Sequence, residues 1–252
     1  MNLSDLQTTW DGLGGADPLW SILTEADKKG RRWDTAEFFA TGAREIDALM
    51  TDLRSLGRSP GRRAALDFGC GVGRLTQPLT KHFDAVVGVD LSHEMVRLAQ
   101  VHNRAPDRCR YVVNASADLA MLPTGSFDLV LSYLTLQHMP PRYTMSYLRE
   151  LVRVARVGGV ICVQLPAAPA TFSEALRVSV RNVRNSLRAV LARFGIGRGA
   201  EMAMYGVKRG TVHDLLRVAG AHLEDAMPAN HFTPGWTGYR YIAIKELESS
   251  PP

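Results

Sequence analysis

The chain has 252 residues, 46% of them hydrophobic and 22% charged, and it carries a formal net charge of +5. This length fits one domain with additions better than two full domains. The modest basic excess indicates a solvated face, with attraction to an anionic ligand as the alternative. No apolar run approaches the roughly 20 residues that span a bilayer, and no signal-peptide pattern opens the chain, so we expect a soluble, cytoplasmic protein.

Residues 1–60 are predicted to form an N-terminal helical cap. The stretch "RRWDTAEFFATGAREIDALM" is rich in aromatic residues and begins with a possible N-cap at Asp34 or Thr35. Ile46, Leu49 and Leu53 then recur at helical spacing. The stretch "GRSPGRR" interrupts this pattern before the first apolar strand, so the main domain is expected to start at residue 61.

Strand and helix patterns alternate from residue 61 onward. Short apolar segments separated by helical patterns are typical of a parallel sheet with helices on both faces. We therefore predict an α/β fold over residues 61–246, a Rossmann-like, doubly wound and mostly parallel sheet of seven strands. The strands are expected at residues 63–69, 85–91, 109–115, 127–134, 158–166, 222–228 and 238–247, and the helices between them at 73–83, 92–103, 142–156 and 211–221.

A helical insert at residues 170–210 is predicted to precede the last two strands. Its helix, expected over residues 173–195, has an apolar stripe on one face and arginines on another. The stripe could close a lid or form a homodimer, whereas the arginines could follow nucleic-acid phosphates. We favour a lid or dimer, because "SYLT", after the fourth predicted strand, lacks the Asn/Asp-Pro-Pro-aromatic tetrapeptide that enzymes acting on exocyclic amino groups of bases commonly have there.

The stretch "ALDFGCGVGRLTQ" leads from the first predicted strand into a loop with Gly69, Gly71 and Gly73. Glycine permits positive φ and lets a ligand touch the backbone, and the N–H groups at a helix start favour negative charge. Asp67 ends the first strand and Asp90 ends the second. In a doubly wound sheet this places Asp90 beside the loop, where it could accept two ribose hydroxyls. A structural turn without a ligand is the alternative.

Two nucleotide-like cofactors compete for this loop. A dinucleotide site requires G-x-G-x-x-G, in which the third glycine allows close packing of the helix on the strand. This chain has D-x-G-x-G-x-G, with Arg74 where the dinucleotide pattern has glycine. The difference favours S-adenosylmethionine, whose amino-acid end needs no pyrophosphate cradle.

Four segments, in this order, resemble the motifs of class I S-adenosylmethionine-dependent methyltransferases of the type 11 kind. They are "LDFGCGVGRLT", "VVGVDLSHEM", "ADLAMLPTGSFDLVLSYLTLQHM" and "LRELVRVARVGGVICVQLP". Together they cover residues 62–166, and the closing strands extend the resemblance toward residue 246. The resemblance implies a Rossmann-like fold, an S-adenosylmethionine cofactor and a methyl-transfer reaction.

The resemblance also implies which residues would hold the cofactor. Asp90 would accept the ribose hydroxyls, and Trp33 of the cap would face the sulfonium, because a cation is attracted to a ring face. The methionine moiety would lie against Asp67, Gly69, Gly71, Gly73 and Arg74. The adenine would lie against Leu91 and Met95, with its amino group donating to Asp118 and a ring nitrogen accepting from the Leu119 N–H.

His138 follows the fourth predicted strand within "SYLTLQHMPPRY". Methyl transfer to a hydroxyl requires loss of the hydroxyl proton, and imidazole titrates near neutral pH. We therefore predict that His138 is the general base or orients the acceptor, with a His that hydrogen-bonds backbone as the alternative. Tyr133 and Gln137, in the same stretch, are expected to line the acceptor site.

The segment "NHFTPGWTGYRY" holds a second cluster, with His231 as a further catalytic candidate. Trp236 and Tyr239 are predicted to form an aromatic wall for a sugar ring or an aromatic acceptor, and core packing is the alternative. His138 and His231, with a nearby carboxylate, could also bind a divalent cation such as Mg²⁺ that polarises a sugar diol. No ligand spacing in the sequence supports that cation directly.

The predicted reaction is O-methylation of a small hydroxylated acceptor. The chain as a whole resembles actinobacterial methyltransferases that act on sugars and natural products, including mannosides. Two other classes stay open, namely an N- or C-methyltransferase of a small molecule and a non-catalytic partner protein that binds the cofactor.

Overall fold

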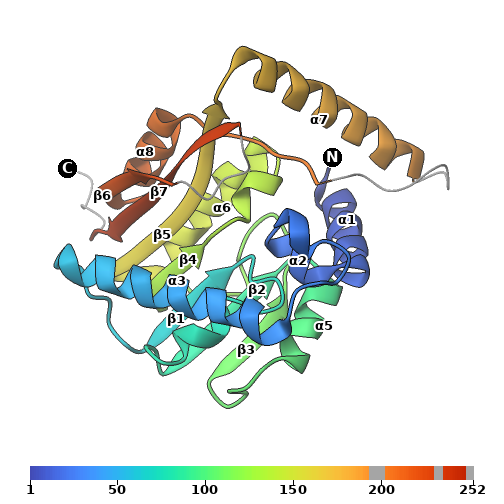
Figure 1. The fold of residues 1–252 in the computed structure, drawn as a ribbon. Coiled ribbons are helices and arrows are strands. Elements are labelled where there is room, and N and C mark those ends of the chain that lie inside the picture. The colour runs from blue at the N-terminus through green and yellow to red at the C-terminus, as the bar shows by residue number, and fades with distance from the viewer. Residues whose placement is uncertain (193–201, 230–234, 248–252) are drawn as a thin grey trace.

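The structure, a computed structural model, describes residues 1–192, 202–229 and 235–247 and is built on a seven-stranded sheet (Figure 1). The strand order is β3-β2-β1-β4-β5-β7-β6, and β7 runs antiparallel to both of its neighbours. The predicted fold class is thereby confirmed. The strands are β1 (Ala64–Phe68), β2 (Ala85–Asp90), β3 (Cys109–Val113), β4 (Phe127–Ser132), β5 (Ala155–Pro169), β6 (Ala221–Pro228) and β7 (Trp236–Lys245).

The helices fall into an N-terminal group and a group that connects the strands. Asp34 caps α3, because its side chain accepts a 2.8 Å hydrogen bond from the Glu37 N–H. The N-terminal group is α1 (Leu3–Ala16), α2 (Pro18–Ile22), the 3₁₀ turn η1 (Ala26–Lys28) and α3 (Thr35–Ser55). The connecting elements are α4 (Thr76–Leu79), α5 (His93–Val101), the 3₁₀ turn η2 (Leu136–His138), α6 (Pro141–Val154), α7 (Phe172–Ala192) and α8 (Arg209–Val218).

The helix predicted over residues 73–83 is wrong in extent, since α4 covers four residues. Gly73 has a φ of +87°, outside the helical region, so the glycine loop continues beyond it. At the other end, the Thr80 hydroxyl donates to the Gln77 carbonyl at 2.6 Å and so takes an acceptor that a longer helix would use.

Both faces of the sheet are covered by helices. Successive strand residues point to opposite faces, so Leu66 packs toward α6 and α8, whereas Ala65 packs toward α3, α4 and α5. In Figure 1, α3 crosses the front of the sheet and α6 and α8 lie behind it. Because the faces are closed, the accessible edge is the one at the carboxyl ends of the parallel strands.

Helix α1 is fastened beside this edge. Asp11 accepts hydrogen bonds from the Ser92 hydroxyl (2.6 Å) and the Glu94 N–H (3.2 Å), and the Gln7 amide donates to the Leu91 carbonyl (2.9 Å). These contacts hold the N-terminal cap against the turn between β2 and α5, immediately after Asp90.

Helix α7 lies at the edge of the molecule, far from α3 (Figure 1). Its apolar stripe faces outward, because Leu176, Val180 and Val183 are 58%, 60% and 70% exposed. On its other side, the Asn182 amide donates to the Met204 carbonyl at 3.0 Å. The end of the predicted helix, residues 193–195, lies outside the described residues.

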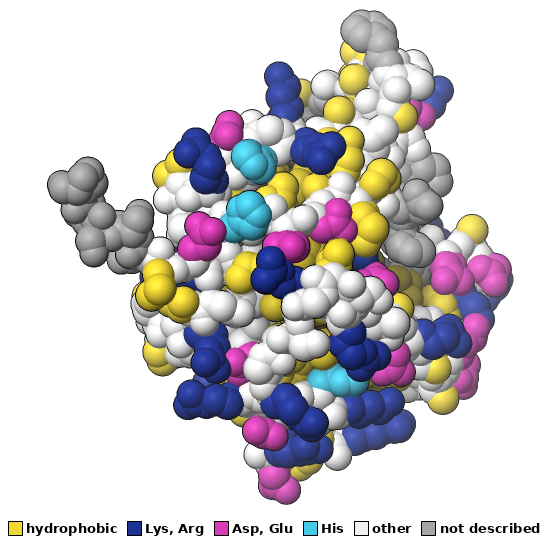
Figure 2. Space-filling view, turned by 90° about the vertical axis from the view of Figure 1, so that its left-hand side faces the viewer, with side chains coloured by type: hydrophobic (Ala, Val, Ile, Leu, Met, Phe, Trp, Pro, Cys, Tyr) yellow, Lys and Arg dark blue, Asp and Glu magenta, His cyan; other side chains and the backbone are white. Residues whose placement is uncertain are grey.

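Basic and acidic side chains are interspersed over the face shown in Figure 2, with several Lys and Arg along its lower edge. Across residues 1–192, 202–229 and 235–247, no helix combines the length and apolar character needed to cross a membrane.

Candidate active site

The glycine loop leaves β1 with its backbone in the left-handed region. Gly69 and Gly71 have φ values of +80° and +52°, which side-chain-bearing residues rarely adopt. A Cβ at Gly69 would stand 2.0 Å from Thr135 Oγ1, and one at Gly71 would stand 2.6 Å from Ile22 Cδ1. The loop therefore requires glycine for both conformation and space, and Gly69 and Gly71 present bare backbone to a cavity.

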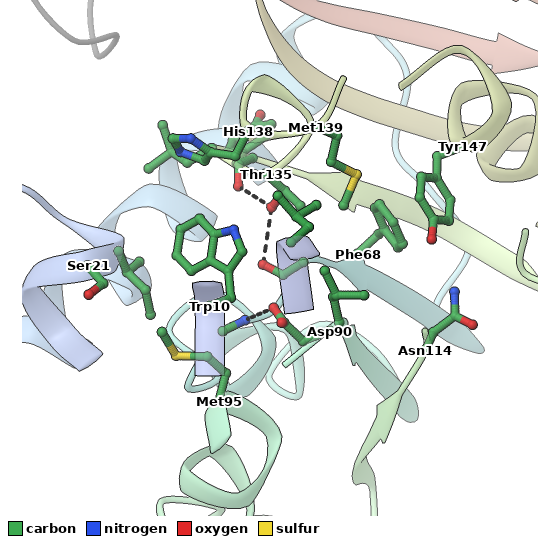
Figure 3. Close-up of a pocket in the computed structure, with 17 residues that line it drawn as sticks. Trp10, Ser21, Phe68, Asp90, Met95, Asn114, Thr135, His138, Met139 and Tyr147 are labelled. Carbon is green, nitrogen blue, oxygen red and sulfur yellow. Dashed lines mark hydrogen bonds between the residues drawn. The ribbon is translucent and has the colours of Figure 1, made fainter. Parts of the chain in front are cut away.

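Asp90 joins this loop to the end of β2. Its Oδ2 accepts a 2.8 Å hydrogen bond from the Gly71 N–H (Figure 3), and its Oδ1 accepts a 2.9 Å hydrogen bond from the Ser92 N–H. Burial raises the pKa of Asp90 above its ordinary value, while these N–H groups favour the charged form. Each carboxylate oxygen can accept a further bond, so Asp90 can take two neighbouring hydroxyls.

The first cavity lies between α1, the glycine loop and the ends of β2, β3 and β4. Leu91 and Met95 line it, as do Gly69, Gly71 and Asp90 of the predicted set. In Figure 3, the Trp10 indole stands in the middle of the view, between Asp90 and His138. The Trp10 and His138 rings meet edge to face, with centroids 5.2 Å apart. An apolar wall and a carboxylate thus share one enclosed space.

Asp67 is 2% exposed and is not among the residues that line the first cavity. Its Oδ2 accepts a 2.6 Å hydrogen bond from the Thr76 hydroxyl, so it ties β1 to α4. Burial raises its pKa to about 7. The geometry gives Asp67 a role in holding the loop, rather than the predicted contact with a ligand. Gly73, in the same loop, is not among the residues that line the first cavity, and a Cβ there would stand 2.4 Å from the Tyr111 hydroxyl.

The structure gives the Leu119 backbone N–H a partner within the protein. Its N–H donates to Glu150 Oε2 at 2.8 Å and is therefore already engaged, and its side chain is fully buried. Asp118 is exposed, and its Oδ1 accepts from the Ala120 N–H at 3.2 Å. Asn114 lines this end of the first cavity instead, together with Tyr147.

Trp33 is also away from the first cavity. Its indole N–H donates to the Leu23 carbonyl at 3.1 Å, and its ring packs edge to face on Phe38. Hydrogen bonding and packing within the cap hold this side chain, so the aromatic residue of the cap that lines the first cavity is Trp10 rather than Trp33.

A second cavity adjoins the first and shares Tyr133, Leu134 and His138 with it. Polar and charged side chains from several elements converge on it. They include Arg44, Glu45, Arg74, Gln137, Gln164 and Arg240. Arg74 is 3% exposed and pairs with Glu45 at 2.7 Å, whereas Arg240 pairs with Asp52 at 2.7 Å. Arg74 thus lines this second cavity and is away from the first.

His138 is 6% exposed, and both of its ring nitrogens have partners. Nδ1 lies 2.8 Å from the Ala203 carbonyl oxygen, and Nε2 lies 3.1 Å from Gln137 Nε2. A carbonyl only accepts, so Nδ1 carries the proton and Nε2 accepts from the Gln137 amide. Burial lowers the pKa of His138 to about 4, so the imidazole is neutral at pH 7.

The aromatic wall expected near the last strands is not part of either cavity. The Tyr239 ring lies under the Arg209 guanidinium, 5.0 Å from its centroid, and next to Tyr241. Trp236 lies against Gly206, where a Cβ would stand 2.9 Å from its ring. His231 lies outside the described residues. Over the described part of the chain, no three His, Cys, Asp or Glu side chains are grouped to hold a metal ion.

Several lining residues were missed by the sequence reasoning, although three of them carry a signal. Gln164 interrupts the apolar run of β5, and Arg240 interrupts that of β7, so both polar residues stand in otherwise buried strands. Asn114 follows β3 directly, at the edge where Asp90 ends β2. A polar residue within or just after a buried strand is therefore the pattern that would have found them. Thr135 carries no such signal.

Residues 66–163 match the family model described as "Methyltransferase domain". Among curated relatives, a ubiquinone biosynthesis O-methyltransferase of Xanthomonas oryzae pv. oryzae is 33% identical over 113 residues, which is 44% of this chain. That match spans 46% of the relative, so the chain spans about half the length of the curated relatives that are about one third identical to it. An enzyme of the same name from Aromatoleum aromaticum is 29% identical over 74% of this chain and 70% of its own length.

Among solved structures, magnesium protoporphyrin IX methyltransferase from Synechocystis, with bound SAH, superposes with a TM-score of 0.63. The two sequences are 19% identical, and the alignment covers 97% of this chain and 99% of that one. A SAM-dependent methyltransferase from Methanosarcina mazei has a TM-score of 0.60 at 20% identity, over 76% of this chain and 96% of its own. These likenesses concern the fold, and they agree with the resemblance carried by the four sequence motifs.

Proposed function

We propose that the protein is a class I methyltransferase, which transfers a methyl group from S-adenosylmethionine to a hydroxyl of a small acceptor. The observation that carries this proposal is the link between Asp90 and the Gly71 N–H at the mouth of the first cavity. It places a hydroxyl-binding carboxylate beside bare backbone at the topological switch point of the sheet.

The residues of the first cavity fit this cofactor. Asp90 offers free lone pairs for ribose hydroxyls, and Leu91 and Met95 offer an apolar surface for adenine. Gly69 and Gly71 expose backbone where a side chain would clash. Trp10 presents an indole ring to the same space, and a sulfonium cation is attracted to such a ring.

When bound, S-adenosylmethionine supplies a methyl group on a sulfonium, a leaving group that departs with the bonding electron pair. The chain's part is to bring the acceptor oxygen in line, and the wall shared by the two cavities is where this can occur. The acceptor would occupy the second cavity. His138 Nε2 is unprotonated and accepts a hydrogen bond from the Gln137 amide. If that hydrogen bond opens, Nε2 can receive the proton of the acceptor hydroxyl; if it stays, His138 holds Gln137 in place.

A hydroxyl acceptor is favoured over an amine or carbon acceptor by the curated relatives, which are named as O-methyltransferases. Within that class we propose a polar, hydroxyl-bearing acceptor such as a sugar or a hydroxylated natural product, since polar side chains line much of the second cavity. We do not propose a nucleic-acid partner, because "SYLT" stands at the end of β4, where methyltransferases of exocyclic base amines commonly have an Asn/Asp-Pro-Pro-aromatic tetrapeptide.

Two finer proposals concern the rest of the chain. Residues 1–60 act as the cap over the cofactor, supported by the position of Trp10, and residues 170–210 act as a lid or dimer element. The exposed Leu176, Val180 and Val183 support the latter. Light scattering of the wild-type protein and of a Val180→Ser, Val183→Ser variant tests the dimer.

Calorimetry with S-adenosylmethionine, followed by a screen of sugars, phenols and amines with a labelled methyl donor, tests the proposed function. Asp90→Ala is expected to weaken cofactor binding at least tenfold, because two hydrogen bonds to a charged acceptor are lost. Asp107→Asn, at an exposed position, is the matched control. Heat of binding without methyl transfer to any acceptor would favour a non-catalytic partner protein, and no heat of binding would overturn the proposal.

A further inference from the structure

We propose that the second cavity is a subsite for a polyhydroxylated, sugar-like acceptor, in which the side-chain oxygens of Gln137 and Gln164 each accept a hydrogen bond from an acceptor hydroxyl. This inference rests on the proposed function and specifies what its acceptor site recognises. It also assigns the acceptor contact to Gln137, with His138 as a positioning residue that acts through it.

The first observation is a set of buried polar atoms that have no hydrogen-bond partner among the described residues. They are Arg74 Nε, the Tyr133 hydroxyl, Gln137 Oε1 and Gln164 Oε1. Each of these side chains is 3–5% exposed, and all four line the second cavity. Buried polar groups in folded proteins usually have partners, so these atoms around one cavity are candidates for contact with a ligand, and the two glutamine oxygens carry the inference.

The second observation determines which end of the Gln137 amide lacks a hydrogen-bond partner. The Ala203 carbonyl can only accept, so His138 Nδ1 must carry the proton and Nε2 must accept. The Gln137 Nε2 group is thereby directed to His138, at 3.1 Å, and the oxygen Oε1 is the end left without a partner. Gln137 therefore offers the ligand an acceptor and requires a donor from it.

The ligand chemistry follows from the set as a whole. Gln137 and Gln164 offer acceptors, whereas Arg74 Nε offers a donor. The Tyr133 hydroxyl offers a donor too, since burial raises the pKa of Tyr133 well above its ordinary value. A carboxylate or phosphate brings acceptors only and would leave the Gln137 oxygen unpaired. Neighbouring hydroxyl groups both donate and accept, so a polyol satisfies all four groups.

Charge and wall composition agree with a neutral polyol. Arg74 is paired with Glu45, and Arg240 is paired with Asp52, so these two guanidinium groups are matched. The third arginine of the lining, Arg44, is exposed to solvent. Among the described residues that line this cavity, the aromatic side chains are Tyr133 and His138. The His138 ring is already packed edge to face against Trp10, so a flat acceptor has little aromatic surface on which to stack. These features favour a puckered polyol ring over a planar phenol.

The test measures binding of small probes to the full-length protein saturated with S-adenosylhomocysteine, by saturation-transfer NMR and titration. The probes are methyl α-D-mannopyranoside and methyl α-D-glucopyranoside as polyols, catechol as a flat diol, cyclohexanol as a single hydroxyl and glucuronate as an acid. At least one of the two glycosides is expected to bind several-fold more tightly than any of the other three probes. Preferential binding of catechol, cyclohexanol or glucuronate, or binding of no glycoside, would overturn the proposal.

Matched variants test the two glutamines separately. Gln164→Met keeps the length of the side chain without its oxygen and is expected to weaken glycoside binding five- to tenfold. Gln164→Glu keeps an acceptor oxygen and is expected to restore it. Gln100→Leu, on the exposed side of α5, is the control. Equal binding by Gln164→Met and wild type would remove Gln164 from the subsite.

The positioning role of His138 is tested by comparing glycoside binding in single and double variants of His138 and Gln137. His138→Phe removes the Nε2 acceptor, so Gln137 can turn either end toward the cavity, and glycoside binding is expected to fall about as much as in Gln137→Met. The double variant is expected to fall no further, because both changes act on one contact. Calorimetry with S-adenosylhomocysteine on Gln137→Met and Gln164→Met separates this result from failure of the proposed function, because neither glutamine lines the first cavity and cofactor binding by these two variants is expected to stay within twofold.

Discussion

Thr135 lies directly against Gly69. The Thr135 hydroxyl donates to the Gly69 carbonyl at 3.2 Å, and a Cβ at Gly69 would stand 2.0 Å from Thr135 Oγ1. The turn after β4 therefore closes on the loop after β1, and the two strand ends that flank the switch point act as one unit.

Gly69→Ala is expected to destabilise the protein by more than about 3 kcal/mol, because it adds a steric clash to a backbone conformation with positive φ. Gly125→Ala is the control, since Gly125 has a φ of +66° with open space around it. That variant should show the backbone cost alone, about 1 kcal/mol. Thermal and urea unfolding measure both, and Thr135→Gly should recover part of the loss in Gly69→Ala.

Asp67 and His138 are expected to give stability opposite dependences on pH. The pKa of Asp67 is about 7 in the folded protein and 3.8 as its ordinary value. Between these two pH values the folded state therefore binds one more proton than the unfolded state. The contribution of Asp67 to the free energy of unfolding falls by about 1.4 kcal/mol per pH unit as the pH rises from 4 to 7. Asp67→Asn should remove that fall and raise stability at pH 8, as measured by urea unfolding at several pH values.

The pKa of His138 is about 4 in the folded protein, below its ordinary value of 6.5. The unfolded state binds the extra proton between pH 4 and 6.5, so this contribution is present above pH 6.5 and is lost progressively toward pH 4. In this window it opposes that of Asp67. His138→Gln should therefore make the protein relatively more stable toward acid, whereas Asp67→Asn should make it relatively less so. Two variants with the same slope would contradict the assignment.

The ion pair between Arg156 and Asp128 is expected to matter more than those on the surface. Asp128 is 1% exposed and accepts from Arg156 Nη1 (2.5 Å) and from the Ala64 N–H (3.0 Å). Arg156→Ala leaves a buried carboxylate without its cation and should cost about 1–3 kcal/mol. Arg97→Ala breaks the exposed pair with Glu94 and should cost at most about 0.5 kcal/mol. Chemical denaturation of both variants makes the comparison.

Much of the cofactor site follows from short stretches of sequence. Gly69, Gly71, Asp90, Leu91 and Met95 each lie within a few residues of a strand end, and all of them line the first cavity. Parallel strands bring their carboxyl ends to one edge, so local pattern and strand order are sufficient to place them. The roles of Asp118, Leu119 and Trp33 could not be settled in this way, because neighbours distant in sequence decide where such groups point.

The sequence by itself determined the doubly wound sheet and the glycine loop with Asp90, since periodicity and backbone conformation are local properties. The tertiary structure decided which groups remain available at that edge. Glu150 takes the Leu119 N–H, and the Ala203 carbonyl fixes the proton of His138 and, through it, the orientation of Gln137. The physical reason is that a hydrogen-bonding group has a limited number of partners, and which partner it takes depends on residues that only folding brings together.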